Sequence, residues 1–430
     1  MTGPAPDLIA DLQARGLVQD HTDLAALATR LEEGPISAYY GCDPTADSLH
    51  AGNLIGLLIL RRLQLAGHRP VALAGGATGM IGDPSGRSDE RNLLDEETLA
   101  TNMASIKEQV ARFVDFAPGP NQAVLVDNLS WTGPMTVIDF LREVGKHATV
   151  NQMVAKESVR SRMEGEDGIS FTEFSYMLLQ ANDYWWLHEH EGVDLQIGGS
   201  DQWGNITAGI DMVRRRSGHA VHGLTWPLIT RADGAKFGKS TGDSIWLGAH
   251  RTSPYRFFQY WIQVDDRDVG RFLAQLTLLP LDEIAAVLAE HEQAPERRIA
   301  QRRLADEVTT LVHGPEEAAT AKAASAVLFG SPLEGVTAAT LSALAGEVPT
   351  AVVERAAFDG EGADPVDLLV RSGLSASKGE ARRTISQGGA YANGERLVEG
   401  KGVGTFDLLH DRYLLLRRGK RAYALVTVEG

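Results

Sequence analysis

The stretch ISAYYGCDPTADSLHAGNLIGLLILRRLQLAG, residues 36–67, decides the fold. It begins with a short apolar run, Ile36–Gly41, which predicts a β-strand, and it continues through a loop that contains Pro44. Over about Asn53–Ala66 the apolar residues recur at helical spacing, and Gly67 ends that pattern. A strand, a loop and a helix in this order begin an alternating α/β arrangement.

The alternation continues along the first half of the chain. Further apolar runs predict strands at Val71–Ala74, Val124–Val126 and Asp194–Gly198, and helical stretches separate them. Strands that alternate with helices imply a parallel sheet with crossover helices, and ligands of such sheets bind beyond the carboxyl ends of the strands. We therefore predict an α/β fold in which the glycine-rich loops after the strands form the site.

The second half of the chain changes character twice. The pattern from about Pro254 to Phe329 is almost purely helical, and residues 330–362 are rich in Ala, Gly, Pro and Thr. Helical patterns at Asp364–Ser372 and Lys378–Gln387 then precede short strands. The predicted organisation is an α/β domain at 1–225, a lysine-containing linker at 226–253, an α-helical domain at 254–329, a linker at 330–362 and a small α+β domain at 363–430.

Composition excludes several classes of protein. The chain has 430 residues and a single cysteine, Cys42, so a disulfide framework and a multi-cysteine zinc site are excluded and a cytoplasmic location is favoured. The first 16 residues lack the apolar core of a signal peptide. The longest apolar run, Leu54–Leu60, is far too short to span a bilayer.

Charge is unevenly distributed along the chain. The net charge is −16, which by itself argues against a nucleic-acid partner. From Asp364 to the end there are 11 Lys+Arg and 8 Asp+Glu, a balance of +3, so the rest of the chain carries −19. Such asymmetry marks either a basic recognition module on an acidic body or an ordinary fluctuation of surface charge, and charge alone does not separate the two.

The loop Gly41–Asn53 leads into a helix, and a helix N-terminus attracts phosphate through its unpaired N–H groups. Thr45 and His50 add hydrogen-bond donors there, and Gly52 allows a ligand to approach the backbone closely. The alternative is that His50 only caps the helix.

A second glycine-rich stretch, Gly75–Gly86, follows an apolar strand directly. Because Asp83 lies inside it as a single charge, a ligand cradle is favoured over a long flexible turn. Arg87 and Arg91 follow the stretch and have the length to reach a polyphosphate, although two solvated surface residues would give the same pattern.

Two later segments also place polar groups where a ligand would bind. In the predicted helix Phe171–Trp186, the residues Tyr176, Gln180 and Asp183 share one face, which is either a solvated stripe or the wall of a small polar pocket. The stretch Gly198–Asn205 puts a carboxylate after two glycines, an arrangement suited to ribose hydroxyls, although an ordinary glycine-rich turn is the alternative.

The stretch Asp233–Ser240 gathers two lysines among glycines but fails the spacing of a P-loop, so it predicts a loop that brings two ammonium groups to a polyphosphate. No G-x-G-x-x-G pattern occurs, which disfavours a dinucleotide site. The run His188-Glu189-His190 lacks the i, i+4 spacing of a zinc-binding helix, and no metal site is predicted.

Taken together, these segments resemble the class I aminoacyl-tRNA synthetases, and among them the bacterial tyrosyl-tRNA synthetases. His50–Asn53 is similar to the His-x-Gly-His motif of the class, with Asn53 in place of the last histidine, and Lys236–Ser240 is similar to the Lys-Met-Ser-Lys-Ser loop. The stretches Tyr39–Thr45, Gly75–Gly86, Phe171–Gln180 and Gly198–Asn205 resemble the tyrosine enzymes specifically, in matching order over the whole chain. The resemblance implies a Rossmann-like catalytic domain, a helical anticodon-arm domain and a small RNA-binding domain.

The resemblance also implies a role for each matching residue. Tyr39 and Asp183 would bind the phenolic hydroxyl of tyrosine; Asp83, Tyr176 and Gln180 would bind its ammonium group, and Gln202 would lie near its carboxylate. The adenylate site would include Asp43, His50, Gly52, Asn53, Gly199, Asp201 and Lys239. The phosphates would be held by Thr45, His50, Arg87, Arg91, Lys236 and Lys239.

The implied reaction joins tyrosine to ATP, with Mg²⁺ accompanying the ATP and no permanent cofactor, and then to tRNA. The family is a homodimer, and Trp131–Val150 is a candidate for an apolar interface helix. Two alternatives are a tryptophan-specific synthetase and a non-enzymatic RNA-binding protein on the same scaffold. The phenol-binding pair argues against the first, and the phosphate-binding residues argue against the second.

Overall fold

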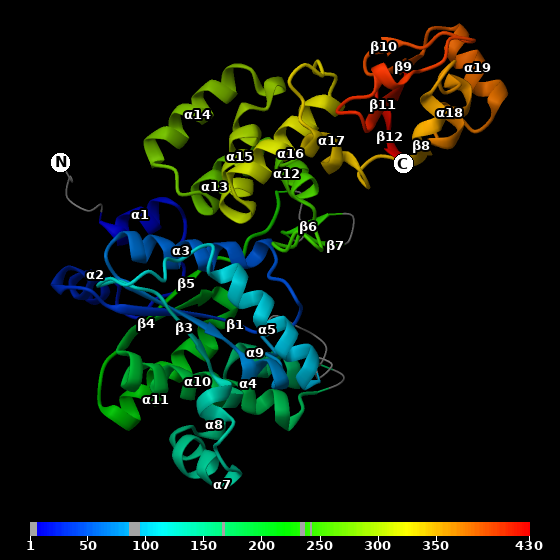
Figure 1. The fold of residues 1–430 in the computed structure, drawn as a ribbon. Coiled ribbons are helices and arrows are strands. Elements are labelled where there is room, and N and C mark those ends of the chain that lie inside the picture. The colour runs from blue at the N-terminus through cyan, green and yellow to red at the C-terminus, as the bar shows by residue number, and fades with distance from the viewer. Residues whose placement is uncertain (1–6, 86–94, 166–167, 233–236, 241–242) are drawn as a thin grey trace. The chain divides into compact units, whose positions relative to one another are not determined.

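The structure of the protein is a computed structural model, shown in Figure 1, that describes residues 7–85, 95–165, 168–232, 237–240 and 243–430. The chain divides into two compact units. The first unit consists of Met1–Thr252 and Val264–Leu304, and the second consists of Ser253–Gln263 and Ala305–Gly430. Each unit therefore contains segments that are distant in sequence.

A five-stranded parallel sheet forms the centre of the first unit, in the order β3-β2-β1-β4-β5. Its strands are β1 (Ser37–Cys42), β2 (Arg69–Ala74), β3 (Val124–Asp127), β4 (Val193–Gly199) and β5 (His222–Trp226). The chain passes outward from β1 to β2 and β3, and then returns to the other side of β1. In such a sheet the ligand-binding crevice opens between β1 and β4, at the carboxyl ends of the strands.

Long helices cover both faces of this sheet (Figure 1). They are α3 (Leu54–Leu65) and α5 (Glu96–Val110) on one face, and α10 (Phe171–Glu191) and α11 (Trp203–Ser217) on the other. Residues 54–60 of α3 are all buried, which explains why this first part of the helix carries no polar side chain. The predicted α/β fold, with its first four strands and the helix after β1, is confirmed.

Further elements lie wholly in the first unit. They are α1 (Leu8–Ala14), α2 (Leu24–Glu33), η1 (Ala51–Asn53), α4 (Gly76–Ile81), α6 (Leu129–Thr132), α7 (Val137–Asp139), η2 (Phe140–Val144), η3 (Gly145–His147), α8 (Val150–Val154), α9 (Glu157–Met163), η4 (Ser200–Gln202), β6 (Lys239–Ser240), β7 (Asp243–Ser244), α13 (Asp266–Leu276), α14 (Leu281–Gln293) and η5 (Pro295–Arg297). The expected single helix at Trp131–Val150 is wrong, because α7, a π-helical turn and a 3-10 turn divide that segment.

The glycine-rich stretch after β2 differs from a flexible turn, because part of it is helix α4. Its glycines are required by close packing. A Cβ atom on Gly75 would lie 2.2 Å from an Asp43 carboxylate oxygen, and one on Gly76 would lie 2.3 Å from a carboxylate oxygen of Asp127. Since real Cβ contacts are essentially never that short, a larger residue at either position would displace these carboxylates.

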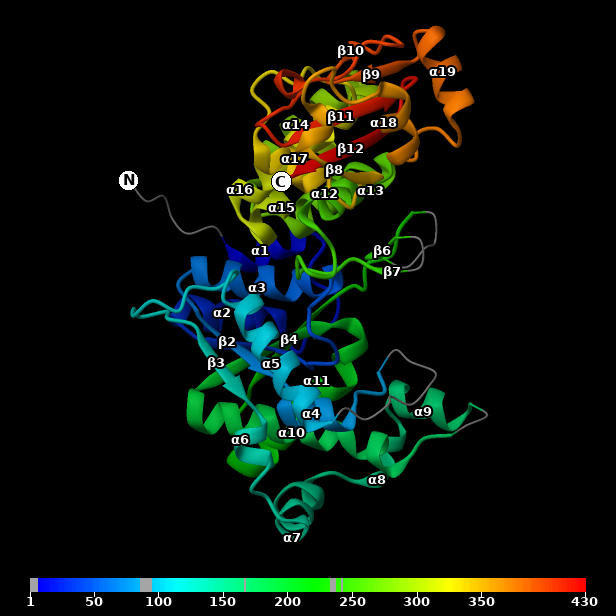
Figure 2. The ribbon, with the colours of Figure 1, turned by 45° about the vertical axis from the view of Figure 1, so that its right-hand side comes forward.

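The second unit combines helices with a mixed sheet. Its helices are α12 (Pro254–Ile262), the later part of α15 (Ile299–His313), α16 (Pro315–Leu328), α17 (Ala338–Leu344), η6 (Arg355–Phe358), α18 (Pro365–Arg371), α19 (Lys378–Ser386) and η7 (Thr405–Asp407). The sheet order is β10-β9-β11-β12-β8, with β8 (Thr350–Glu354), β9 (Ala390–Ala392), β10 (Glu395–Arg396), β11 (Tyr413–Arg418) and β12 (Ala422–Glu429). Figure 2 shows β11 and β12 side by side, with α18 next to them.

The residues predicted as a linker, 330–362, contain α17 and β8. Strand β8 pairs in parallel with β12, so the small sheet begins before residue 363. A five-residue edge strand with alternating burial, within a stretch rich in Ala, Gly and Pro, gives little signal in the sequence. The other predicted domain boundaries stay predictions. Among the residues that the structure describes, no helix is long and apolar enough to cross a membrane.

Candidate active site

The candidate site lies at the carboxyl ends of β1, β2 and β4, where polar side chains from three loops meet the inner face of α10. Asp43 follows β1, Asp83 follows α4, and Asp201 lies in the turn after β4. On α10, Tyr176 and Asp183 are buried and Gln180 is half-buried, which rules out the solvated stripe. The carboxylates and the polar face of the helix therefore form one cluster of polar side chains, which is the candidate pocket.

A buried phenol and a buried carboxylate mark one end of this pocket. Asp183 accepts hydrogen bonds from Asn128 Nδ2 at 2.9 Å and from Trp131 Nε1 at 2.8 Å. Burial raises the pKa of Asp183 to about 7, and these two hydrogen bonds oppose that shift. Tyr39, on β1, is 2% exposed, and its hydroxyl has no hydrogen-bond partner among the described residues.

Besides burial, the charge of Asp183 affects the pKa of Tyr39. Burial and, after it, the charge of Asp183 hold the pKa of Tyr39 well above its ordinary value, so Tyr39 carries a neutral hydroxyl. The ring of Tyr39 packs edge-to-face against that of Tyr184, with centroids 5.3 Å apart. A buried hydroxyl without a partner is costly, and a ligand hydroxyl placed here would supply one.

A network of amides and carboxylates forms the middle of the pocket. Gln202 Nε2 donates to Asp83 Oδ2 at 2.7 Å, and Asn205 Nδ2 donates to Gln180 Oε1 at 3.1 Å. Asn205 Nδ2 also lies 3.5 Å from Asp83 Oδ1. Asp83, Gln180 and Gln202, to which the resemblance assigned roles, thus meet at one place. Asn205 joins them, although it was assigned no role.

Asp43 joins this middle region to the strand ends. Its Oδ2 accepts from the Tyr176 hydroxyl at 2.8 Å, and its Oδ1 accepts from Thr78 Oγ1 at 2.6 Å. Burial, and then the charges of Asp43 and Asp83, hold the pKa of Tyr176 well above its ordinary value. Several carboxylates close to one buried phenol make the pocket electronegative, which suits a positively charged ammonium group.

The far end of the site begins at η1, where His50 caps the short helix. His50 Nδ1 accepts from the Gly52 backbone N–H at 3.0 Å, so a neutral imidazole carries its proton on Nε2, where it is a donor. Asn53 Oδ1 accepts from the His50 backbone N–H at 3.1 Å, and Asn53 Nδ2 lies 3.4 Å from the Tyr40 hydroxyl. Thr45 is exposed, in the loop between β1 and η1. His50 is therefore both a cap and a donor.

The turn after β4 carries the remaining carboxylate. Gly199 ends β4, and a Cβ atom there would lie 2.6 Å from Asp201 Oδ1. Asp201 is half-buried, and burial raises its pKa above the ordinary value. Cys42 lies below the site, and burial raises the pKa of its thiol to about 12, which makes it unreactive at neutral pH.

Three of the expected phosphate-binding residues, Arg87, Arg91 and Lys236, lie outside the described residues. Lys239 begins strand β6, which pairs with β7. The sequence reasoning missed Asn128, Trp131, Thr78 and Asn205 as partners of the site. Asn128 follows β3 directly, so the rule that placed the other loops at the carboxyl ends of strands was a usable signal for it.

Comparison with known proteins gives concordant matches along the chain. Residues 31–330 match the family model of class I tRNA synthetases (W and Y), and residues 341–426 match that of the tyrosine–tRNA ligase SYY-like C-terminal domain. The tyrosine–tRNA ligase of Opitutus terrae is 53% identical over 422 residues, 98% of this chain and 99% of the relative. That of Bacillus caldotenax is 52% identical over 424 residues, with coverage of 98% and 99%.

Solved structures agree with these matches. A C-terminally truncated mitochondrial tyrosyl-tRNA synthetase from Aspergillus nidulans has a TM-score of 0.69 and 31% identity, over 75% of this chain and 94% of that one. A tryptophanyl-tRNA synthetase from Plasmodium falciparum has a TM-score of 0.55 at 16% identity, over 73% of this chain and 86% of that one, and it supports the fold alone.

Proposed function

The chain belongs to the class I tRNA synthetases for tryptophan and tyrosine, and within them to the tyrosine–tRNA ligases, and from this membership we propose which of its residues carry the reaction. Tyrosine, ATP and tRNA are the substrates that the activity requires. The observation that carries the residue assignment is the buried Tyr39 hydroxyl, which has no hydrogen-bond partner in the part of the chain that the structure describes and is influenced by the charge of the buried Asp183 carboxylate.

We propose that the substrate phenol binds between Tyr39 and Asp183. Asn128 and Trp131 hold the Asp183 carboxylate in place through its two oxygens, so its remaining lone pairs can accept from the phenol. Phenylalanine would bury the same polar groups without satisfying them, at a cost of about 1–3 kcal/mol for each group. This pocket therefore selects tyrosine by the penalty on a substrate that lacks the hydroxyl.

The ammonium group of tyrosine is proposed to bind Asp83, Tyr176 and Gln180. Tyr176 donates its proton to Asp43 and keeps its oxygen lone pairs as acceptors for the ammonium. Gln202 and Asn205 hold the carboxylate and the amide of this subsite in place, and Gln202 would lie near the substrate carboxylate. This arrangement directs the carboxylate of tyrosine toward the nucleotide end of the site.

In the first step, the tyrosine carboxylate attacks the α-phosphorus of ATP, a new C–O–P linkage forms, and the bond to pyrophosphate breaks. A carboxylate is already ionised at neutral pH, so positioning and charge stabilisation carry the catalysis and no general base is needed. Asp43, Gly52, Asn53, Gly199 and Asp201 would hold the adenosine part. ATP enters as its Mg²⁺ complex, which neutralises part of the triphosphate charge.

Negative charge grows on the departing pyrophosphate, where Thr45, His50, Arg87, Arg91, Lys236 and Lys239 are proposed to bind. Groups that bind this charge more tightly in the transition state raise the rate without tightening tyrosine binding. Lys236→Ala and Lys239→Ala should each slow adenylate formation about 10²-fold or more, the size of effect seen when one stabilising group is removed. A large loss of tyrosine affinity in equilibrium dialysis would contradict this assignment.

The experiment that tests the function is tyrosine-dependent exchange of labelled pyrophosphate into ATP, with phenylalanine and tryptophan as controls. Exchange with tyrosine alone is expected. Exchange with tryptophan would keep the chemistry and overturn the pocket assignment. No exchange with any amino acid, from folded protein with Mg²⁺, would favour the RNA-binding alternative.

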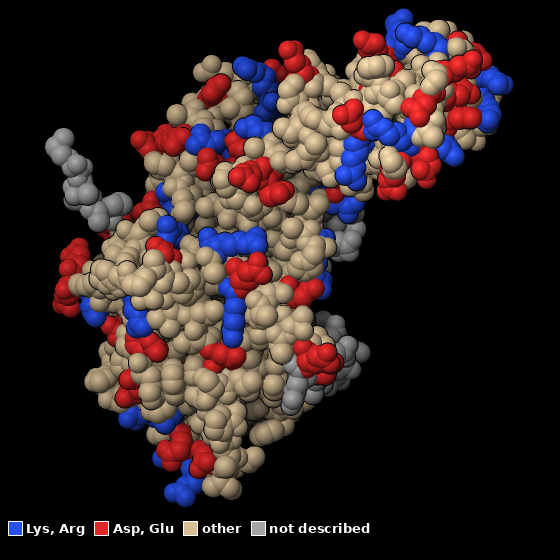
Figure 3. Space-filling model, in the orientation of Figure 1, with Lys and Arg blue, Asp and Glu red and all other residues tan. Residues whose placement is uncertain are grey.

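The second step transfers tyrosine to the 3′-terminal ribose of tRNA(Tyr), and we propose that the second unit binds this tRNA. Its positive balance from Asp364 onward supports the assignment. The positive charge is partly paired, since Lys378 contacts Asp367 and Arg418 contacts Glu380. On the face drawn in Figure 3, residues of both signs are intermixed over this unit. Binding should therefore depend on particular residues more than on a continuous basic surface.

A homodimer in the cytoplasm is the proposed working form. Val137, Ile138 and Leu141 are exposed large apolar residues at α7 and η2, within the segment predicted to supply an interface. Exposed apolar groups that lie together mark association surfaces. Leu141→Asp should shift the protein from dimer to monomer in sedimentation velocity, and an unchanged sedimentation coefficient would place the interface elsewhere.

A further inference from the structure

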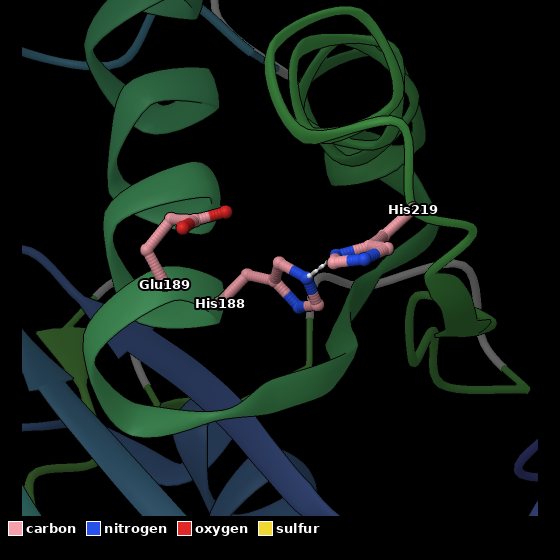
Figure 4. A group of neighbouring side chains, drawn as sticks. All are labelled: His188, Glu189 and His219. Carbon is pink, nitrogen blue, oxygen red and sulfur yellow. Dashed lines mark hydrogen bonds between the residues drawn. The ribbon is translucent and has the colours of Figure 1, made fainter.

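Three potential metal ligands meet on the surface of the first unit, away from the candidate active site (Figure 4). His188 and Glu189 lie in the last turn of α10, and His219 lies in the loop between α11 and β5. His188 Nε2 and His219 Nδ1 are 3.0 Å apart, and the ligand atoms of all three residues lie within 4.8 Å of one another. The fold thus joins a histidine pair that the sequence separates by 31 residues.

His190, the second histidine of the run His188-Glu189-His190, contacts Trp186 and not the three potential ligands. Its Nδ1 hydrogen-bonds the Trp186 carbonyl oxygen at 2.9 Å, and its ring stacks on the Trp186 ring with centroids 4.3 Å apart. The spacing of His188 and His190 in the sequence therefore says nothing about this cluster, because the imidazole that lies beside His188 is that of His219, in another loop.

The imidazole of His188 is held in the orientation that a metal ligand needs. Its Nδ1 lies 3.0 Å from the Val193 carbonyl oxygen, which can only accept, so Nδ1 carries the proton and Nε2 presents a lone pair toward His219. A carboxylate oxygen of Asp194 lies 3.7 Å from the same Nδ1. A carbonyl or carboxylate behind the ring is the usual support of a metal-binding histidine, since it fixes the tautomer and raises the basicity of the ligand nitrogen.

Glu189 has support of the same kind. Its Oε1 accepts from the Ser217 hydroxyl, and the Ser217 oxygen in turn accepts from Trp185 Nε1 at 3.0 Å. His188 and Glu189 are thus both held in place by hydrogen bonds to residues outside the cluster. His219 is exposed and can adjust its position.

We propose that His188, Glu189 and His219 bind one divalent transition-metal ion of the zinc type. Two imidazoles and a carboxylate are the donor set that Zn²⁺ prefers outside thiolate sites. Tetrahedral bonds of about 2.0–2.1 Å place two ligand nitrogens roughly 3.3 Å apart, so the distance between the two nitrogens needs to grow by a few tenths of an ångström, and the rings need to rotate until both lone pairs face the ion. The proton on His219 Nδ1 moves to Nε2 of the same ring, and solvent supplies the fourth ligand.

A metal here would connect the end of α10 to the loop that precedes β5. The earlier turns of α10 carry Tyr176, Gln180 and Asp183, and none of these contacts the three ligands. The ion would therefore stabilise the first unit and would take no part in tyrosine activation.

The test is calorimetric titration of the chelator-treated full chain with zinc chloride alone, without ATP or tyrosine. We expect one site per chain, with a dissociation constant in the micromolar range or below, and a zinc-dependent rise in the melting temperature. His219→Ala should weaken this site roughly tenfold or more, because the loss of a partner behind a ligand already costs about 10- to 100-fold in affinity and the loss of the ligand itself should cost no less. His190→Ala is the matched control, because His190 lies on the same helix but points away, and it should leave the affinity unchanged.

Equal losses in the His219 and His190 variants, or no loss in either, would overturn the proposal. Glu189→Gln provides a second variant that keeps the size and the hydrogen-bonding ability of the side chain, and it should weaken zinc binding while the melting temperature without metal stays close to that of the wild type. Cobalt(II) titration adds a spectroscopic criterion: a visible absorption band of tetrahedral intensity is expected in the wild type and in His190→Ala. Its presence in His219→Ala would also contradict the site.

Discussion

At the scale of single residues, the buried Tyr39 hydroxyl is a stability cost, which the substrate phenol would relieve in the proposed site. Removing it with Tyr39→Phe should stabilise the unliganded protein by about 1–3 kcal/mol, because a buried polar group without a partner disappears. The same change should weaken tyrosine binding about 2- to 12-fold, for the loss of about 0.5–1.5 kcal/mol from one hydrogen bond. Urea unfolding and equilibrium dialysis measure the two effects.

Tyr184→Phe is the matched control for this prediction. Tyr184 packs against Tyr39, but its hydroxyl donates to the His222 carbonyl oxygen at 2.6 Å. Its removal should therefore destabilise the protein by about 1 kcal/mol or more, since a paired carbonyl oxygen loses its donor. Destabilisation by both changes would mean that the Tyr39 hydroxyl already has a partner in the unliganded protein.

Asp183 should make tyrosine binding depend on pH. Its pKa is raised to about 7, and in the proposed site the substrate phenol donates to the ionised carboxylate. Lowering the pH through 7 protonates Asp183 and removes that acceptor. Because only about one tenth of the carboxylate is ionised one pH unit below its pKa, tyrosine should bind roughly tenfold more weakly at pH 6 than at pH 8. Binding to Asp183→Asn should be weak and independent of pH over this range, and a flat profile in the wild type would contradict the raised pKa.

At the scale of elements, one buried ion pair fixes α9 against the first turn of α10. Arg162 and Glu173 are 6% and 3% exposed, and two parallel hydrogen bonds of 2.8 Å join them. Arg162→Met should cost about 3–5 kcal/mol in the free energy of unfolding, because it leaves the Glu173 charge buried and unpaired.

Arg160→Met is the control for this change, since Arg160 makes an exposed pair with Glu157 on the same helix and should cost less than about 1 kcal/mol. The double variant Arg162→Met/Glu173→Leu should recover much of the lost stability, because no charge stays buried. Equal costs for Arg160→Met and Arg162→Met in chemical denaturation would show that the buried pair contributes no more than the exposed one.

Elements also show how far the sequence predicts this structure. The strands β1 to β4 and the helix after β1 could be predicted, because short apolar runs and helical spacing are signals that lie within a few neighbouring residues of the sequence. Helix α4 could not, because its glycines signal a turn, and only the neighbouring Asp43 and Asp127 explain why they are needed. Trp131 escaped prediction for a similar reason: its role depends on contact with Asp183, more than 50 residues away.

At the scale of the whole molecule, the two units should respond differently to ligand. All of the described candidate site residues lie in Met1–Thr252, within the first unit. Tyrosine at 100 times its dissociation constant should stabilise that unit by about 2.7 kcal/mol and leave the second unit unchanged. Differential scanning calorimetry should therefore show two transitions, only one of which moves with tyrosine, and a single transition that shifts as a whole would mean that the units unfold together.

The assignment of α12 to the second unit has a consequence for synthesis on the ribosome. Ser253–Gln263 belongs with Ala305–Gly430, although the 41 residues in between belong to the first unit. At a translation rate of about 5–20 residues per second, α12 emerges roughly 3–13 seconds before its partner α16 is complete. During that interval Phe257, Phe258 and Trp261, buried in the finished protein, have no core to join. This nascent helix therefore exposes apolar side chains of the kind that chaperones bind.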